Sequence, residues 1–205
     1  MTQLTGHDAA PRINGQLCAM LAIDIAESTR PDRDEEIQLY LRFSLYGLLR
    51  EALGTCGMPW DQCLCEDRGD GMVIIFRPGL AAQPLIDLLP DRLKDLIGRH
   101  NRCCREAARM QLRVAANIGP VYCDEHGFAG DDVTLLCRML DAQPLRQALC
   151  ETGSELAFII SDYVYEKLVL RGHSLAAPKS FRRVRTQVKR SSVHGWIYQP
   201  DGPPA

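Results

Sequence analysis

Two aspartates that border short apolar runs are the residues of this chain best placed to do chemistry. Asp24 directly follows the apolar run 17–23, and Asp70 lies between Gly69 and Gly71, just before the apolar run 72–76. Both runs have the length of buried strands, so each carboxylate is expected at a strand end. Mg²⁺ takes oxygen ligands, commonly one or two carboxylates completed by water and substrate phosphate. The pair indicates a divalent-metal site, whereas the Gly-Asp-Gly sequence taken alone is more typical of a plain hairpin turn.

A helix predicted over residues 130–142 supplies a second set of polar residues. Gly130, Thr134 and Arg138 recur every four residues and therefore share one face of this helix. Such a stripe can lie along a nucleotide, and it is equally compatible with an ordinary arginine that faces solvent.

The elements around these residues are expected to form an α+β fold, a mixed sheet with helices packed on one face. The residues at 31–34 predict the start of a helix over 34–53, and a second helical region is interrupted at Pro90. Predicted strands cover residues 63–66, 72–76, 111–118, 156–160, 181–188 and 193–198, with residues 121–123 as a hairpin partner of the strand before Gly119 and Pro120.

Composition limits the class of protein. A chain of 205 residues with a net charge of −2 is expected to form one globular domain without a general attraction to nucleic acid. Residues 1–15 are polar and no apolar run approaches a membrane span, so we expect a cytoplasmic protein and no membrane contact. The nine cysteines contain no paired C-x-x-C motifs for zinc and are expected to be reduced core residues. Basic residues cluster over 179–190, where nucleic-acid binding is an unfavoured alternative.

In order and spacing, these segments resemble the class III nucleotidyl cyclases, the adenylate and guanylate cyclase catalytic domains. Asp24 and Ile25 resemble the family's first metal-binding motif, and residues 69–71 resemble its second. Residues 112–121 resemble the strand before the catalytic helix. Residues 130–138 match the segment that carries a ribose-contacting Asn, here Thr134, and a transition-state arginine, here Arg138. The resemblance implies a ferredoxin-like core over residues 17–199, with an N-terminal extension over 1–16 and a frayed tail over 200–205.

The resemblance also implies an activity. Family members convert a nucleoside triphosphate to a 3′,5′-cyclic nucleotide and pyrophosphate, using two Mg²⁺ or Mn²⁺ ions per site. Here Asp24, Ile25 and Asp70 would hold the metal, and Arg138 would stabilise charge at the α-phosphate. Lys189 or Arg190 would hold the terminal phosphates.

The family's sites are shared between two chains, so the resemblance implies a homodimer in which a lone chain is inactive. We expect no fused sensor domain in this chain. In this it is similar to the stand-alone bacterial cyclases that make cyclic pyrimidine nucleotides as antiphage signals, and a separate effector protein would bind the product.

Several departures from the family pattern matter. Glu27 and Ser28 replace a usual Gly-Phe pair, and Thr134 replaces the Asn. They leave open a catalytically degenerate module for nucleotide binding or dimerisation. Glu66 stands at the base-reading position and can accept hydrogen bonds from guanine or from the amino group of cytosine, while Gly127 leaves its usual partner position empty. We therefore expect ATP to be a poorer substrate.

Overall fold

A mixed eight-stranded sheet forms the centre of the computed structural model, which describes residues 13–188 and 191–199. Its strand order is β2-β3-β1-β4-β6-β8-β7, with β5 paired to β4, and within the described ranges only the pairing of β4 with β6 is parallel. The strands are β1 (Asn14–Ile25), β2 (Cys63–Asp67), β3 (Gly71–Phe76), β4 (Leu112–Asp124), β5 (Gly127–Ala129), β6 (Leu156–Ser161), β7 (Phe181–Val188) and β8 (Ser191–Tyr198).

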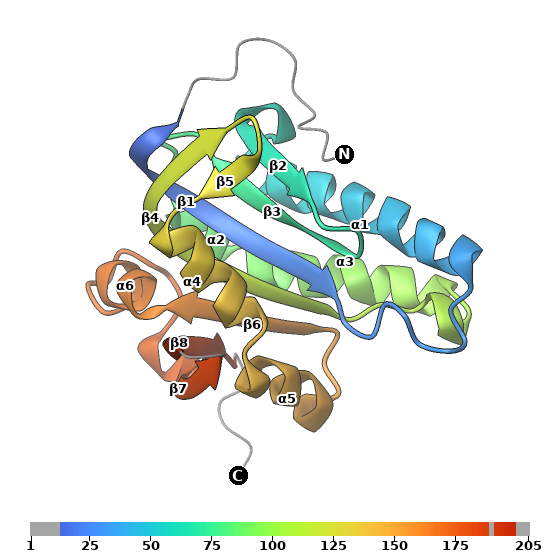
Figure 1. The fold of residues 1–205 in the computed structure, drawn as a ribbon. Helices are drawn as coiled ribbons and strands as arrows, with labels where there is room; N and C mark the ends of the chain where they lie inside the picture. Colours follow the sequence, from blue (N-terminus) through green and yellow to red (C-terminus); the bar gives the residue numbers. More distant parts are fainter. Residues whose placement is uncertain (1–12, 189–190, 200–205) are drawn as a thin grey trace.

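Helices cover both faces of this sheet (Figure 1). Behind the sheet in that view lie α1 (Glu35–Thr55), α2 (Gln83–Asp87) and α3 (Leu89–Cys103), and in front lie α4 (Asp131–Leu140) and α5 (Gln143–Thr152). The short α6 (Asp162–Val164) continues as a π-helical turn (Tyr165–Val169), and 3₁₀ turns occupy Trp60–Gln62, Glu106–Ala108 and Pro178–Ser180. None of the helices in the described ranges is both long and apolar enough to cross a bilayer.

The central strand β1 explains why both faces need cover. Ala19, Leu21 and Ile23 are buried against α1 and α3, whereas Met20 and Ala22 alternate with them and are buried against α4 and α5. Successive side chains of a strand point to opposite faces, so a continuous apolar run requires two hydrophobic layers. The polar residue Asp24 continues the second series, on the side of α4.

The start of α1 follows the prediction from sequence. The Asp34 carboxylate accepts a hydrogen bond from the Ile37 backbone N–H at 2.9 Å, which caps the helix. Glu35 and Glu36 add favourable charge in the first turn. The predicted range of 34–53 differs from α1 only at its ends.

Three expectations need correction. The helices pack on both faces of the sheet rather than on one, because α4 and α5 cover the face opposite α1 and α3. The sequence analysis does not predict α5, which has Pro144 in its first turn and ends at Gly153 in the left-handed conformation. Residues 121–123 continue β4, because β1 pairs with β4 through Pro120 to Tyr122, and the hairpin partner is β5. The cysteines are free, but only Cys18, Cys56, Cys63 and Cys65 are buried.

Candidate active site

The two predicted metal-binding aspartates lie side by side at the edge of the sheet that is formed by strand ends, where β1 ends and β3 begins. Asp24 pairs across the ladder with Gly71, and the Ile25 backbone N–H donates to the Asp70 carbonyl oxygen at 3.0 Å. A Cβ at Gly71 would lie 2.1 Å from the Ile23 carbonyl oxygen, so only glycine allows β3 to approach β1 this closely. The sequence Gly-Asp-Gly therefore fixes Asp70 beside the end of β1.

The Asp24 carboxylate is mostly buried and bound by an arginine from β4. Arg113 donates through Nε to Asp24 Oδ1 at 2.8 Å and through Nη2 to Asp24 Oδ2 at 2.7 Å. Burial raises the pKa of Asp24 above its ordinary value, and the negative charges of Asp70 and Asp141 act in the same direction, against the lowering effect of Arg113. The charges of the three carboxylates thus interact at this edge of the sheet.

The Asp70 side chain is exposed and held by one neutral donor. The Ser28 hydroxyl donates to Asp70 Oδ2 at 2.5 Å. Ser28, Asp70 and Ile25 line a cavity of about 540 Å³ whose other wall is the first half of α1, including Gln38 and Leu39. This volume is in the usual range for small-molecule sites.

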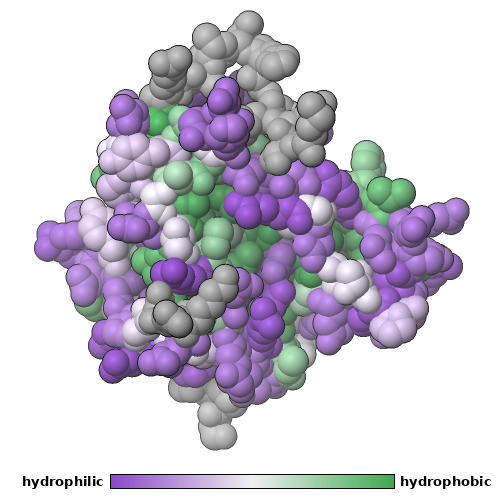
Figure 2. Space-filling view, in the orientation of Figure 1, coloured by the Kyte–Doolittle hydropathy of each residue, from purple (hydrophilic) through white to green (hydrophobic). Residues whose placement is uncertain are grey.

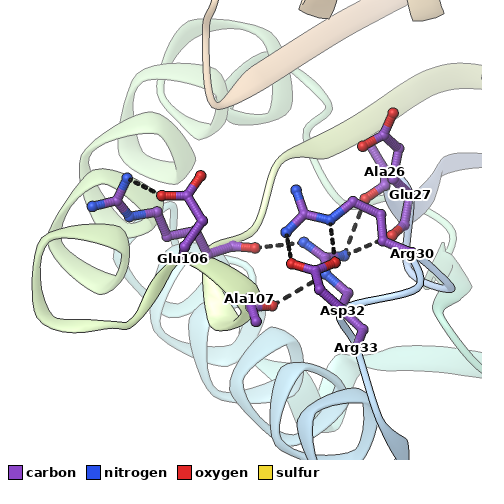
Figure 3. A network of polar contacts seen from close by, with 8 residues as sticks. Ala26, Glu27, Arg30, Asp32, Arg33, Glu106 and Ala107 are labelled. Atoms are coloured by element: carbon purple, nitrogen blue, oxygen red, sulfur yellow. Dashed lines mark hydrogen bonds and ion pairs between the residues drawn. The ribbon is translucent and has the colours of Figure 1, made fainter.

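The loop between Asp24 and α1 is fixed by the buried side chain of Arg33 (Figure 3). Its guanidinium donates to the carbonyl oxygens of Ala26, Glu27, Ala107 and Arg109, over distances from 2.6 to 3.3 Å. Glu27 has a positive φ of 52° and an exposed side chain. The loop is therefore rigid at its backbone, while the carboxylate of Glu27 remains in solvent.

The hairpin tip that carries Asp70 is also tied to α1. Arg42 donates through Nη1 to Asp67 Oδ1 and to the Gly69 carbonyl oxygen, both at 2.7 Å, and the Tyr46 hydroxyl donates to the Asp67 carboxylate. Burial, together with the negative charge of Asp67, raises the pKa of Tyr46 to about 12. The tyrosine therefore remains a proton donor to Asp67 at neutral pH.

The donor set fits a hard divalent cation. Among the residues that the structure describes, no group of three or more His, Cys, Asp or Glu side chains is arranged for metal binding. Two carboxylates with a neighbouring backbone carbonyl are nevertheless the donor set typical of Mg²⁺, which keeps several waters and completes its shell with substrate phosphates. Asp24, Ile25 and Asp70 are the residues that would hold it.

Glu66, the predicted base reader, is already engaged within the chain. It is 8% exposed, its Oε1 pairs with Arg68 Nη2 at 2.7 Å, and its Oε2 accepts from the Phe128 backbone N–H at 3.1 Å. A Cβ at Gly127 would lie 2.6 Å from Glu66 Oε2. The glycine thus leaves room for Glu66, which joins the β2–β3 hairpin to β5.

The apolar face of α4 packs on the sheet through Val133, Leu136 and Met139, and Thr134 on the polar stripe is exposed. The buried Asn117 of β4 donates to the Asp132 carbonyl oxygen at 3.2 Å and fixes the first turn of the helix. The Thr134 hydroxyl donates to the Gly130 carbonyl oxygen at 3.0 Å. Arg138 is half-buried, lies one turn before Asp141, and forms no ion pair with any described residue. Lys189 and Arg190 lie outside the described residues.

Three residues of this site were missed from the sequence. Arg113, Arg33 and Ser28 contact Asp24, its loop and Asp70. The sequence around Arg113 does not indicate its contact with Asp24, because that contact depends on the register in which β1 pairs with β4. Arg33 stands between Asp32 and the helix cap Asp34, and an arginine in such a charged segment is expected to be exposed.

No protein-family model and no curated protein sequence matches the chain, but solved structures do. The adenylate/guanylate cyclase/hydrolase from Silicibacter pomeroyi superposes with a TM-score of 0.63 at 22% identity, over 91% of this chain and 98% of that chain. The guanylyl cyclase Cya2 gives 0.60 at 16% identity, over 89% of this chain and 91% of that one. The guanylate cyclase domain from Catenaria anguillulae in complex with GTP gives a TM-score of 0.55 at 16% identity, over 90% of this chain and 97% of that chain. The chain therefore has the fold of the class III nucleotidyl cyclases, the adenylate and guanylate cyclase catalytic domains.

Proposed function

We propose that this protein is a nucleotidyl cyclase that converts a nucleoside triphosphate to a 3′,5′-cyclic nucleotide and pyrophosphate. The observation that carries the proposal is the meeting of Asp24 and Asp70 at one sheet edge, beside a cavity of about 540 Å³. The fold supports it, and the Catenaria anguillulae domain of the same fold was solved with GTP, which supports a nucleoside triphosphate as substrate.

The chemistry follows from the charges at this edge. Two Mg²⁺ or Mn²⁺ ions bound to Asp24, Ile25 and Asp70 would neutralise triphosphate charge and make the 3′-hydroxyl more acidic. The 3′ oxygen forms a bond to the α-phosphorus, the bond to the bridging oxygen of the β-phosphate breaks, and pyrophosphate leaves with that electron pair. The hydroxyl proton passes to solvent. No protein nucleophile is needed, so the chain's role is to position and stabilise charge.

Arg138 supplies the stabilising positive charge in this proposal. No described residue neutralises its guanidinium, so its donors are available to an α-phosphate oxygen. Removal of a comparable group in phosphoryl transfer reduces the rate by several orders of magnitude. Thr134 contacts the ribose, although its hydroxyl proton is already given to the Gly130 carbonyl, so it can act only as an acceptor. Lys189 or Arg190 holds the terminal phosphates.

The proposed enzyme is a homodimer in which Asp24 and Asp70 of one chain act with Arg138 of the other. Figure 2 shows apolar side chains gathered at the centre of the sheet face that carries α4, surrounded by polar ones. Exposed apolar groups of this kind are typical of surfaces that bind a partner. A two-fold axis would place each α4 against the partner's metal-binding edge and create two equivalent sites.

The product is proposed to be a messenger read by a separate effector protein in the cytoplasm, either a cyclic pyrimidine nucleotide or cyclic GMP, with a role in antiphage signalling. Glu66 supports a base other than adenine, because a carboxylate accepts from the guanine N–H groups or from the cytosine amino group. Each carboxylate oxygen of Glu66 already has one partner, Arg68 or the Phe128 N–H. A base would have to donate to a remaining lone pair on one of these oxygens.

A second candidate is a module that binds nucleotide or dimerises without catalysis. Two observations favour it: the Thr134 hydroxyl is bonded within its own helix, and Arg113 already binds both oxygens of Asp24. Release of pyrophosphate from each of four triphosphates with Mn²⁺ tests the main proposal. Release by the wild type that is lost in Asp24→Asn supports the cyclase. Binding of a nonhydrolysable triphosphate, with no pyrophosphate from any substrate, supports the module.

A further inference from the structure

The ion pair between Asp24 and Arg113 is unusual for a carboxylate that is to bind a metal. The two residues face each other directly in the register of β1 and β4, and the guanidinium binds both carboxylate oxygens in a fork. Their side chains are only 17% and 15% exposed. Bidentate pairs of this type are among the strongest hydrogen-bonded contacts in proteins.

A cation at Asp24 is needed by the fold itself. A buried carboxylate without a partner is costly, and here Asp70 and Asp141 add negative charge nearby. Arg113 supplies this positive charge from within the chain. The other site carboxylate differs, because Asp70 is exposed and its carboxylate accepts, among the residues described, from the neutral hydroxyl of Ser28.

A divalent cation on the same carboxylate would lie close to the guanidinium. Two like charges at such a distance repel each other, and the repulsion is large where both are shielded from water. The fork also fills one lone-pair position on each oxygen of Asp24, which lowers the number of positions open to a metal.

We propose that Arg113 is a built-in placeholder that competes with the divalent cation for Asp24, and that cation binding displaces the guanidinium from at least one carboxylate oxygen. This inference rests on the proposed function, since it takes Asp24 as a metal ligand. It makes Arg113 a positioning residue: the arginine fixes both carboxylate oxygens of Asp24, at the expense of affinity for the free metal.

The test measures Mn²⁺ binding in the absence of nucleotide, by calorimetry and by the electron paramagnetic resonance signal of free Mn²⁺. We expect Arg113→Met to bind Mn²⁺ at least about tenfold more tightly than the wild type. Arg113→Lys, which offers one point of contact instead of a fork, should fall between them. Arg99→Met is the matched control, because Arg99 of α3 forms an exposed ion pair with Glu51 of α1, on the face of the sheet opposite α4. Its Mn²⁺ affinity should equal that of the wild type.

A second readout separates competition from a merely structural ion pair. Mn²⁺ should raise the melting temperature of Arg113→Met more than that of the wild type, because the metal replaces the lost positive charge. If Arg113→Met folds only when Mn²⁺ is present, the same conclusion follows. An Arg113→Met protein that Mn²⁺ does not rescue, together with an Arg113→Lys protein of wild-type affinity, would overturn the inference.

The outcomes also distinguish this inference from the proposed function. If Arg113→Met binds Mn²⁺ no more tightly than the wild type, and the wild type makes cyclic nucleotide, the placeholder role is refuted and the cyclase proposal stands. If Arg113→Met binds Mn²⁺ more tightly, and the wild type makes no product, the placeholder role is supported and catalysis is refuted. Loss of all Mn²⁺ binding in Asp24→Asn confirms that the measured ion occupies this site.

Discussion

The backbone N–H of Ile25 donates to the carbonyl oxygen of Asp70 at 3.0 Å, which joins the end of β1 to the turn before β3. Asp24 and Asp70 are therefore placed by main-chain contacts, and neither depends on its own side chain to reach the site. Because the Asp70 side chain is also exposed, its carboxylate can be changed without loss of the fold.

Asp70→Ala should lower turnover by at least about a hundredfold. Since Asp70 is exposed and its carboxylate accepts one hydrogen bond from Ser28, the melting temperature should change by less than about 2 °C. Pyrophosphate release and a thermal scan measure the two effects. Asp95→Ala, at an exposed position of α3, is the control and should leave both unchanged. An Asp70→Ala enzyme of full activity would refute the proposed mechanism.

Arg33→Met should destabilise the protein by about 3 kcal/mol, because it removes charge-assisted hydrogen bonds to four backbone carbonyls in a buried site. Urea denaturation measures this change. Arg30→Met is the matched control: Arg30 pairs with Asp32 near the surface, and its loss should cost less than about 1 kcal/mol. Equal costs for the two variants would show that Arg33 does not fix the loop.

Asp67 should give the protein a specific pH dependence. Burial acts to raise the pKa of Asp67, but hydrogen bonds from Arg42, Tyr46 and the Gly69 N–H outweigh it, so the pKa lies below the ordinary value of 3.8. The unfolded state then binds the proton more readily than the folded state, and the stabilisation is present above pH 3.8 and lost as the pH falls through the lowered pKa. The difference in urea midpoint between the wild type and Asp67→Asn should be constant from pH 5 to 7 and shrink below about pH 4. A difference that grows on acidification would contradict this assignment.

Local signals predicted the elements whose cause is local. Asp34 caps α1 because its carboxylate accepts a hydrogen bond from the Ile37 N–H three residues later. The apolar run 72–76 forms a strand that is buried on both faces. Gly119 and Pro120 locally predict the end of a strand, yet β4 passes through both because β1 pairs with it from Leu112 to Tyr122. Tertiary pairing decides such a case, and the local sequence does not record it.

The site divides in the same way. Asp24 and Asp70 were predicted because each follows or precedes an apolar run, and the fold brings them together. Arg113 lies 89 positions from Asp24, and the contact between them depends on strand register alone. Glu66 was predicted as a free acceptor, but Gly127 allows it to turn toward β5 and bond to Phe128. These contacts required the structure.

The shared site gives a prediction for mixtures of inactive proteins. Asp70→Ala and Arg138→Ala should each be inactive, since one removes the metal ligand and the other the charge at the α-phosphate. After subunit exchange, half of the dimers are mixed and each mixed dimer has one intact site, so the mixture should recover about a quarter of wild-type activity. Exchange can be verified by native mass spectrometry with one protein isotope-labelled. Verified exchange without recovery would mean that both residues serve the same chain.

The identity of the product tests cyclase activity most directly. The wild type is incubated separately with each of the four ribonucleoside triphosphates and Mn²⁺, and the products are resolved by chromatography and identified by mass. We expect a 3′,5′-cyclic monophosphate and pyrophosphate in equal amounts, with ATP a poorer substrate than the preferred triphosphate because Glu66 offers only acceptors to the base. A clear preference for ATP would refute the role given to Glu66, and the absence of any cyclic product, or the formation of nucleoside diphosphate and phosphate instead, would contradict the central claim that the protein is a cyclase.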